Sequence, residues 1–147
     1  MPVPTEADWG DYQSDLDRNY AHEVFAGRTN QEMLPRFRSN VIETTDELRW
    51  MPEVPFRYYV LGFRDYVMAG QFEECEASNA ASCFIRLVLE KLEKQPGDIL
   101  PVMPRLLPAV RHVAMNQASF EASQNIYGNF QEILGRIEAL YDTLGRS

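Results

Sequence analysis

The amino-acid sequence predicts an all-α fold, a single-domain bundle of about six helices formed by residues 1–147. Apolar residues recur at steps of three and four in nearly every segment, which is the helical period. β-Branched residues are scattered without alternation, and no Asn-Gly or Asp-Gly hairpin signal occurs. With 147 residues, 45% of them hydrophobic, the chain can bury the core of one domain. Helices paired and stacked as hairpins are an alternative arrangement, although no repeat of about 30–45 residues is evident.

The first predicted helix runs from about Asp8 to Phe25. One apolar stripe at helical spacing supports it: Trp9, Tyr12, Leu16, Tyr20 and Val24. The acidic residues near its start suit the positive end of the helix dipole, and Gly27 suits a C-cap. We expect residues 1–7, which precede this helix, to form a flexible N-terminal tail.

A second helix is predicted after a capping-box sequence, in which Thr29 is the N-cap and Glu32 reaches back to it. Pro35 falls inside the first two turns, so either a short turn ends there or the helix begins near Leu34. Apolar residues then share one face: Phe37, Val41 and Leu48. The polar run at positions 44–47 either interrupts this helix or caps a new one.

Proline and glycine mark the ends of the next helix. Pro52 and Pro55 suit a first helical turn, where a missing N–H is tolerated. Gly70 ends the apolar stripe that follows, which consists of Phe56, Tyr59, Val60, Phe63 and Val67. This stripe predicts one helix between the prolines and the glycine.

Two further helices are predicted between residues 78 and 114. The first is capped by Ser78 or Asn79 and ends at Pro96-Gly97-Asp98, a stop-and-turn sequence. Its buried face comprises Ala81, Phe84, Ile85, Val88, Leu89 and Leu92. The second begins near Pro104, because apolar residues continue beyond Pro108 at helical spacing.

The C-terminal segment carries the most regular apolar pattern. Its residues are spaced 4, 3, 4, 3 and 4 apart: Ile126, Phe130, Ile133, Ile137, Leu140 and Leu144. Gly128 and Gly135 lie seven apart within this pattern. The pattern predicts a core helix over residues 126–144, and a homodimer seam through the same helix is the alternative.

The negative charge of the chain is concentrated in two segments. The formal net charge is −8. Residues 1–26 hold six acids and one base, residues 71–100 hold six acids and three bases, and the remainder is balanced. A localised field of this sign steers basic partners toward a protein. It also speaks against nucleic-acid binding, which needs a basic surface.

Targeting and redox features predict a cytoplasmic protein without a membrane partner. No apolar stretch approaches the roughly 20 residues that span a bilayer. The N-terminal residues lack the basic and apolar regions of a signal peptide. Cys75 and Cys83 are the only cysteines, too few for a disulfide framework, so we expect free thiols.

No motif for catalysis, cofactor binding or metal binding is present, so we expect no catalytic residue, no cofactor and no metal. His22 and His112 are the only histidines, and neither belongs to a ligand motif. Three aspartates of the first helix and His22 could face one hard cation. A run of acids more commonly forms a solvated surface.

The favoured function is a non-enzymatic binding module of the inhibitor, immunity-protein or adaptor type, which engages a basic partner such as a toxin. Its acidic, aromatic-containing face would comprise Asp8, Trp9, Asp11, Tyr12, Asp15, Asp17, Glu73, Glu74 and Glu76. Aromatic anchors ringed by charge are typical of interfaces. Trp9 could instead only pin the first helix to the bundle.

Two other functions remain open at this stage. A helical-bundle enzyme or small-ligand sensor would use a pocket formed by Arg57, Tyr58, Arg64 and Tyr66, of which the two tyrosines are expected to reach the surface. A structural subunit would self-associate through residues 126–144.

Overall fold

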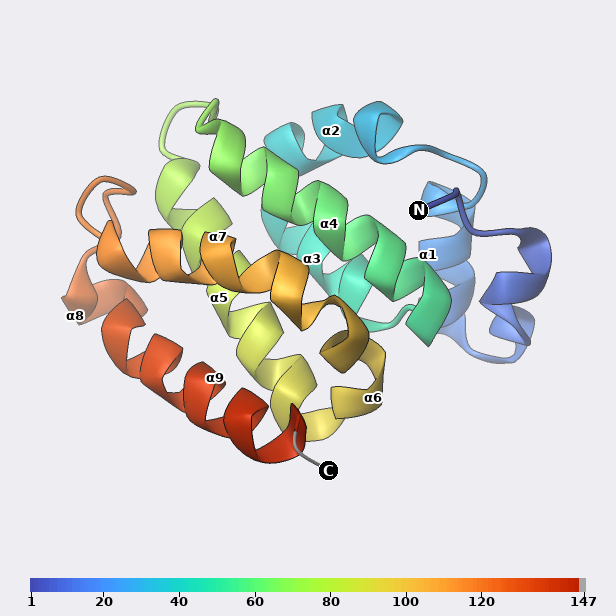
Figure 1. Ribbon diagram of the computed structural model, residues 1–147. Helices are drawn as coiled ribbons and strands as arrows, with labels where there is room; N and C mark the ends of the chain where they lie inside the picture. Colours follow the sequence, from blue (N-terminus) through green and yellow to red (C-terminus); the bar gives the residue numbers. More distant parts are fainter. Residues whose placement is uncertain (146–147) are drawn as a thin grey trace.

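The structure is a computed structural model that describes residues 1–145. Over this range the regular secondary structure is helical, with nine α-helices, three short 3₁₀ helices and no strand (Figure 1). The predicted all-α fold is therefore confirmed. The sequence predicts fewer helices, in part because two of them, α6 and α8, are only four residues long.

The N-terminal part of the chain contains two 3₁₀ helices and four α-helices. They are η1 (Glu6–Trp9), η2 (Tyr12–Ser14), α1 (Leu16–Phe25), α2 (Asn30–Ser39), α3 (Val41–Arg49) and α4 (Glu53–Ala69). The C-terminal part comprises α5 (Ala77–Lys94), α6 (Pro96–Ile99), η3 (Leu100–Val102), α7 (Met103–Met115), α8 (Gln124–Tyr127) and α9 (Phe130–Gly145).

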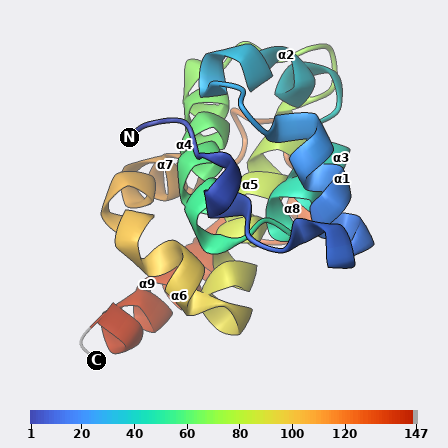
Figure 2. The ribbon, with the colours of Figure 1, turned by 90° about the vertical axis from the view of Figure 1, so that its right-hand side faces the viewer.

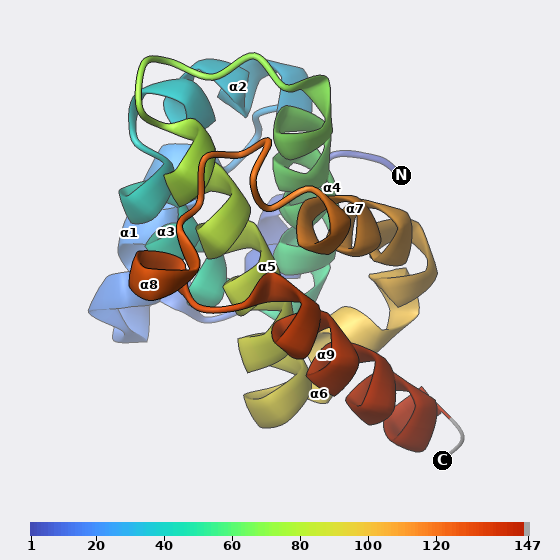
Figure 3. The same ribbon diagram turned by 90° about the vertical axis from the view of Figure 1, so that its left-hand side faces the viewer.

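Helices α4 and α5 form the centre of the molecule, and the other helices pack around them (Figures 1 and 2). Helix α4 packs against α2, α6 and α7, while α5 packs against α3 and α9. Aromatic rings fill the interior, as in the contact of Phe25 with Tyr59, whose ring centroids lie 4.7 Å apart. The C-terminal end of α9 projects from the body (Figure 3).

Several local signals predict their elements correctly. Thr29 and Glu32 form the capping box at the start of α2. Pro35, by contrast, lies inside α2, so both alternatives considered for it, a turn that ends there and a helix that begins near Leu34, are wrong. Gly70 ends α4 in the left-handed conformation, with φ of 69°. Each of these signals depends only on neighbours in the sequence.

The predicted helix from Asp8 to Phe25 is wrong in its first half. Gly10 has φ of 59°, and η1 and η2 replace the regular helix up to Asp15. Within residues 1–7, Pro4 is buried and Val3 packs on the core, while the other five residues are exposed. Their expected flexibility stays a prediction.

The continuous C-terminal helix is also wrong. Gly128, with φ of 79°, separates α8 from α9, and Ile126 is 77% exposed. The apolar residues of the pattern that lie in the first half of α9 are buried: Phe130, Ile133 and Ile137. Smaller differences are that α5 begins at Ala77, before the predicted caps, and that a short helix, α6, replaces the turn predicted at residues 96–98.

None of the helices within residues 1–145 is both long and apolar enough to cross a membrane.

Candidate protein-interaction surface

The N-terminal acidic surface consists of the side chains of Asp8, Asp11, Asp15 and Asp17 together with exposed residues of α1. Asp15 is the N-cap of α1, and its Oδ1 accepts hydrogen bonds from the backbone N–H groups of Asp17, at 2.9 Å, and Arg18, at 3.2 Å. A carboxylate in this position satisfies helix donors and complements the positive end of the dipole. The cap therefore fixes the start of α1 beside the two 3₁₀ helices.

Trp9 is not part of this surface, because only 1% of the side chain is exposed. Its ring lies edge-on to His22, with centroids 5.3 Å apart, and 6.4 Å from the ring of Tyr59 on α4. The structure therefore contradicts the expectation that Trp9 is available to anchor a partner. It supports the alternative, in which Trp9 pins the N-terminal segment to the bundle.

His22, Glu6 and Tyr12 form a clasp that holds the N-terminal segment on α1. The imidazole Nε2 lies 2.8 Å from Glu6 Oε2, and Tyr12 donates its hydroxyl proton to Glu6 Oε1 at 2.7 Å. The rings of Tyr12 and His22 stack with centroids 3.7 Å apart. These hydrogen bonds from His22 and Tyr12 lower the pKa of Glu6, and Glu6 raises the pKa of Tyr12. Tyr12 is thus half-buried in the clasp.

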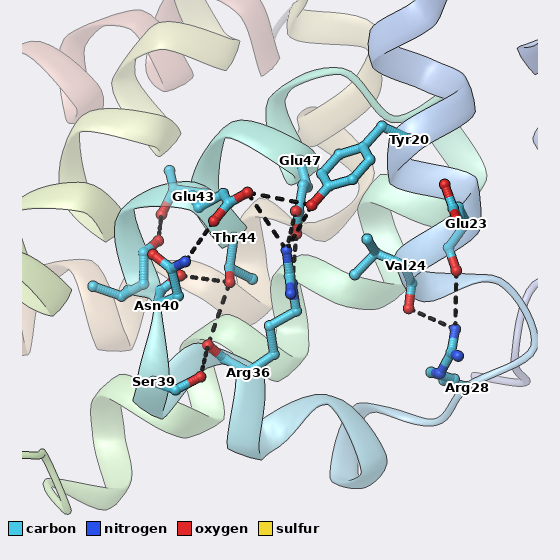
Figure 4. Close-up of polar contacts among 12 residues, drawn as sticks. Tyr20, Glu23, Val24, Arg28, Arg36, Ser39, Asn40, Glu43, Thr44 and Glu47 are labelled. Carbon is cyan, nitrogen blue, oxygen red and sulfur yellow. Dashed lines mark hydrogen bonds and ion pairs between the residues drawn. The ribbon is translucent and has the colours of Figure 1, made fainter.

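The exposed apolar residues beside the aspartates are Leu16 and Tyr20, which sequence periodicity assigns to the core. Leu16 is 87% exposed and Tyr20 is 44% exposed. They lie one helical turn apart, so they share one face of α1. Tyr20 donates its hydroxyl proton to Glu43 Oε1 on α3, at 3.2 Å (Figure 4).

A polar network lies beneath Tyr20, between α1, α2 and α3 (Figure 4). Arg36 donates from Nε to Glu47 Oε1 at 2.9 Å and from Nη2 to Glu47 Oε2. Glu47 is only 3% exposed, and its burial raises its pKa despite the opposing effect of Arg36. Glu47 in turn raises the pKa of Arg36. This bidentate pair ties α2 to α3 under the exposed face.

The second acidic segment begins in the loop between α4 and α5, which lies far from η1 and η2, and continues along the central helix α5 to α6 (Figure 1). Three of its acids form ion pairs: Glu90 with Arg49, Glu93 with Arg136, and Asp98 with Lys91. The others, Glu73, Glu74 and Glu76, lie in and beside the loop between α4 and α5. The single acidic face expected from the sequence is therefore divided into two separate surfaces.

The side chains of the predicted pocket, Arg57, Tyr58, Arg64 and Tyr66, make separate contacts, and a pocket among them stays a prediction. Tyr58 and Tyr66 are 8% and 1% exposed, so the expectation that they reach the surface is wrong. Arg57 donates to the backbone carbonyls of residues 97 and 98, whereas Arg64 contacts Asp65 and the carbonyl of residue 105. The four side chains therefore make contacts with different parts of the bundle.

Two surface hollows lie along α9. An open groove of about 480 Å³ between α7 and α9 is lined by Leu107, Arg111, Glu138, Tyr141, Asp142 and Gly145. A second, of about 330 Å³, lies between α5 and α9 and is lined by Glu93, Arg136, Ala139, Leu140, Thr143 and Leu144. In the part of the chain that the structure describes, no three or more His, Cys, Asp or Glu side chains are grouped to hold a metal ion.

In comparisons with known proteins, the chain matches no family model, no curated protein and no solved structure.

Proposed function

We propose that this protein is a binding module of the inhibitor, immunity-protein or adaptor type, and that its N-terminal acidic surface engages a basic protein partner. One observation carries the proposal. Residues 8–17 contain four aspartates and no Lys, Arg or His, and none of the four forms an ion pair with another described residue. This charge is therefore available to a partner, whereas the acids of α5 and α6 are largely neutralised within the molecule.

Unpaired charge at one end of a molecule acts mainly on the rate of association. Complementary fields raise the association rate constant by orders of magnitude at low salt and suppress partners of the wrong sign. A basic partner is attracted, and nucleic acids or anionic membranes are repelled. A cytoplasmic location, expected from the sequence, stays a prediction.

The test is a comparison of two variants that change the net charge equally at opposite ends. Asp11→Asn, Asp15→Asn and Asp17→Asn together remove three charges at the N-terminal surface, and asparagine still caps α1. The matched control removes three charges from the other acidic loop by Glu73→Gln, Glu74→Gln and Glu76→Gln. The tagged proteins are used to capture partners from the native host, and association rates are measured at increasing salt.

We expect wild type and the control to capture the same basic protein, and the N-terminal variant to associate about tenfold more slowly with a weaker dependence on salt. Capture of no basic protein, or equal slowing by both variants, would show that the proposal is wrong.

Self-association is a second candidate, favoured by the partly exposed Leu140, Tyr141 and Leu144 on the projecting end of α9. Light scattering of the full chain at high concentration tests it. A dimer that Leu140→Ser disrupts supports self-association, and a monomer at every concentration excludes it.

A further inference from the structure

The first turns of α1 expose apolar side chains that no described element covers. Leu16 is 87% exposed and Tyr20, one turn later on the same face, is 44% exposed. Ile42, beside Glu43 on the neighbouring helix α3, is 55% exposed. Single exposed apolar residues are common, but a leucine and a tyrosine on one helix face form a surface on which another side chain can rest.

This face is held in place by contacts on both sides. Asp15 caps the turn that carries Leu16. Tyr20 is held through its hydroxyl by Glu43, at 3.2 Å, and by Arg36 Nη2, at 3.4 Å (Figure 4). Arg36 is itself fixed by its bidentate bond to buried Glu47. Because the face is ordered before binding, a partner loses less free energy to ordering when it binds.

The charged residues around Leu16 and Tyr20 indicate which kind of partner could bind this face. Asp15 and Asp17 flank Leu16 in the sequence and Asp11 precedes them, whereas residues 1–26 contain one arginine, Arg18, which follows Asp17. A second copy that used the same face would bring these aspartates against their equivalents, which is unfavourable. A partner segment with positive charge on both sides of an apolar group would match both the exposed apolar face and the aspartates around it.

From this charge complementarity we infer that α1 receives a segment of a protein partner in which one apolar side chain is flanked by lysines or arginines. The apolar side chain packs on Leu16 and Tyr20, and its basic neighbours face Asp11, Asp15 and Asp17. This inference rests on the proposed function and names the chemistry of the partner's contacting segment.

The probes are two synthetic peptides of nine residues that differ at one position. Each carries two lysines or arginines on either side of the centre, and the central residue is leucine in one and serine in the other. Binding to the full chain is followed by amide chemical shifts in NMR spectra. The protein variants are Leu16→Ser and, as a control at another exposed apolar residue, Ile126→Ser, which changes a side chain 77% exposed on α8.

We expect the leucine peptide to bind wild type about fivefold more tightly than the serine peptide, as partial burial of one leucine implies. Leu16→Ser abolishes this difference, Ile126→Ser preserves it, and the shifted amides lie in α1 and at the start of α3. The high exposure of Leu16 means that its replacement leaves the fold intact.

Equal affinities of the two peptides for wild type would overturn the inference, as would shifts centred on α9 or an unchanged preference in Leu16→Ser. Failure of both peptides to bind also overturns it. The capture experiment with the native host separately decides the proposed function, so the two failures are distinguishable.

Discussion

Cys75 adopts a backbone conformation that side chains with a Cβ rarely take. Its φ is 66°, in the left-handed region, and the residue is exposed in the loop between α4 and α5. This conformation costs an L-residue other than glycine about 1 kcal/mol, because the Cβ approaches the following carbonyl. Glycine has no such cost, although it also increases the freedom of the unfolded chain.

We therefore predict that Cys75→Gly raises the free energy of unfolding by about 0.5 kcal/mol, the difference between these two effects. Cys75→Ala, which keeps the Cβ, serves as the matched control and brings no gain. Urea denaturation of the three proteins measures the difference. A glycine variant no more stable than the alanine variant would contradict the assigned strain.

Leu16 and Tyr20 show that apolar periodicity can identify a helix without identifying which of its residues are buried. Helix α1 carries two overlapping apolar stripes, and the structure buries Ala21 and Phe25 while it exposes Leu16 and Tyr20. Spacing identifies a helix, but the face that is covered depends on which distant helices pack against it. The same reason explains Tyr66, which is buried by stacking on Phe37 of α2.

The N-terminal segment is held on α1 largely by Trp9 and by the clasp of Glu6, Tyr12 and His22. The pKa of Glu6 is lowered mainly by its hydrogen bond with His22. A lowered carboxyl pKa means that the unfolded segment binds a proton more readily than the docked one. The stabilisation is therefore present above the ordinary glutamate pKa and is lost as pH falls through the lowered value.

This clasp predicts a pH-dependent release of the segment. In a Trp50→Phe background, Trp9 is the only tryptophan, and its fluorescence reports its environment. We expect its emission to shift to longer wavelength as pH falls from the ordinary glutamate pKa, about 4.3, through the lowered pKa of Glu6. Glu6→Gln, which cannot ionise, shifts emission less with pH and starts from a more exposed Trp9. Identical pH profiles for the two proteins would exclude a role for Glu6.

Gln117 organises the loop that interrupts the predicted C-terminal helix. Its Nε2 donates to the carbonyls of Ala122, at 2.9 Å, and Gly128, at 2.7 Å, while its Oε1 accepts from the N–H of Phe130 at 2.9 Å. The side chain is only 9% exposed. One amide thus satisfies three backbone groups and sets where α9 begins.

We predict that Gln117→Glu lowers the free energy of unfolding by about 2 kcal/mol at pH 7.5, because a carboxylate then faces two carbonyl oxygens. The introduced carboxyl group has a raised pKa, so the loss is complete above that pKa and diminishes as pH falls to 5. Gln131→Glu, at an exposed position of α9, is the control. Urea denaturation at both pH values tests this, and a loss that grows at pH 5 would contradict it.

The elements therefore divide into those encoded locally and those that depend on distant contacts. Thr29 and Gly70 mark helix ends through their own backbone and side-chain chemistry, and both were predictable. Gly128 lies inside an unbroken apolar pattern. The helix nevertheless ends there, and the Gly128 carbonyl is bonded by Gln117, eleven residues earlier. No local signal distinguishes a glycine that packs within a helix from one that ends it.

On the scale of the whole molecule, the sequence locates the charge but not its arrangement. The acidic segments were evident from composition, and Asp11, Asp15 and Asp17 remain candidates for partner binding. The fold places the loop that carries Glu73, Glu74 and Glu76 far from this surface (Figure 1), and it pairs the helical acids of the same segment with Arg49, Arg136 and Lys91. These pairs join residues about forty positions apart or lie across a turn, and charge counting cannot reveal them.

Lys91 links four helices at the centre of the structure, although its side chain is only 1% exposed. Its Nζ donates to the carbonyl of Arg49 at the end of α3, to Gln95 Oε1 and to Asp98 Oδ2 in α6. The ammonium also lies 4.6 Å from the ring centroid of Phe56 on α4. Burial lowers the pKa of Lys91, and Asp98 opposes this effect.

We predict that Lys91→Met lowers the free energy of unfolding by about 2–3 kcal/mol at pH 7, because three acceptors lose their donor while partly exposed Asp98 can rehydrate. Lys94→Met, one turn later and exposed, is the control and has little effect.

The lowered pKa of Lys91 means that the unfolded chain binds more protons than the folded protein, so the contribution of Lys91 to the free energy of unfolding rises as pH increases toward 10. The difference between wild type and Lys91→Met should therefore widen from pH 7 to pH 10 in urea denaturation. A constant or narrowing difference would show that burial does not dominate the environment of this lysine.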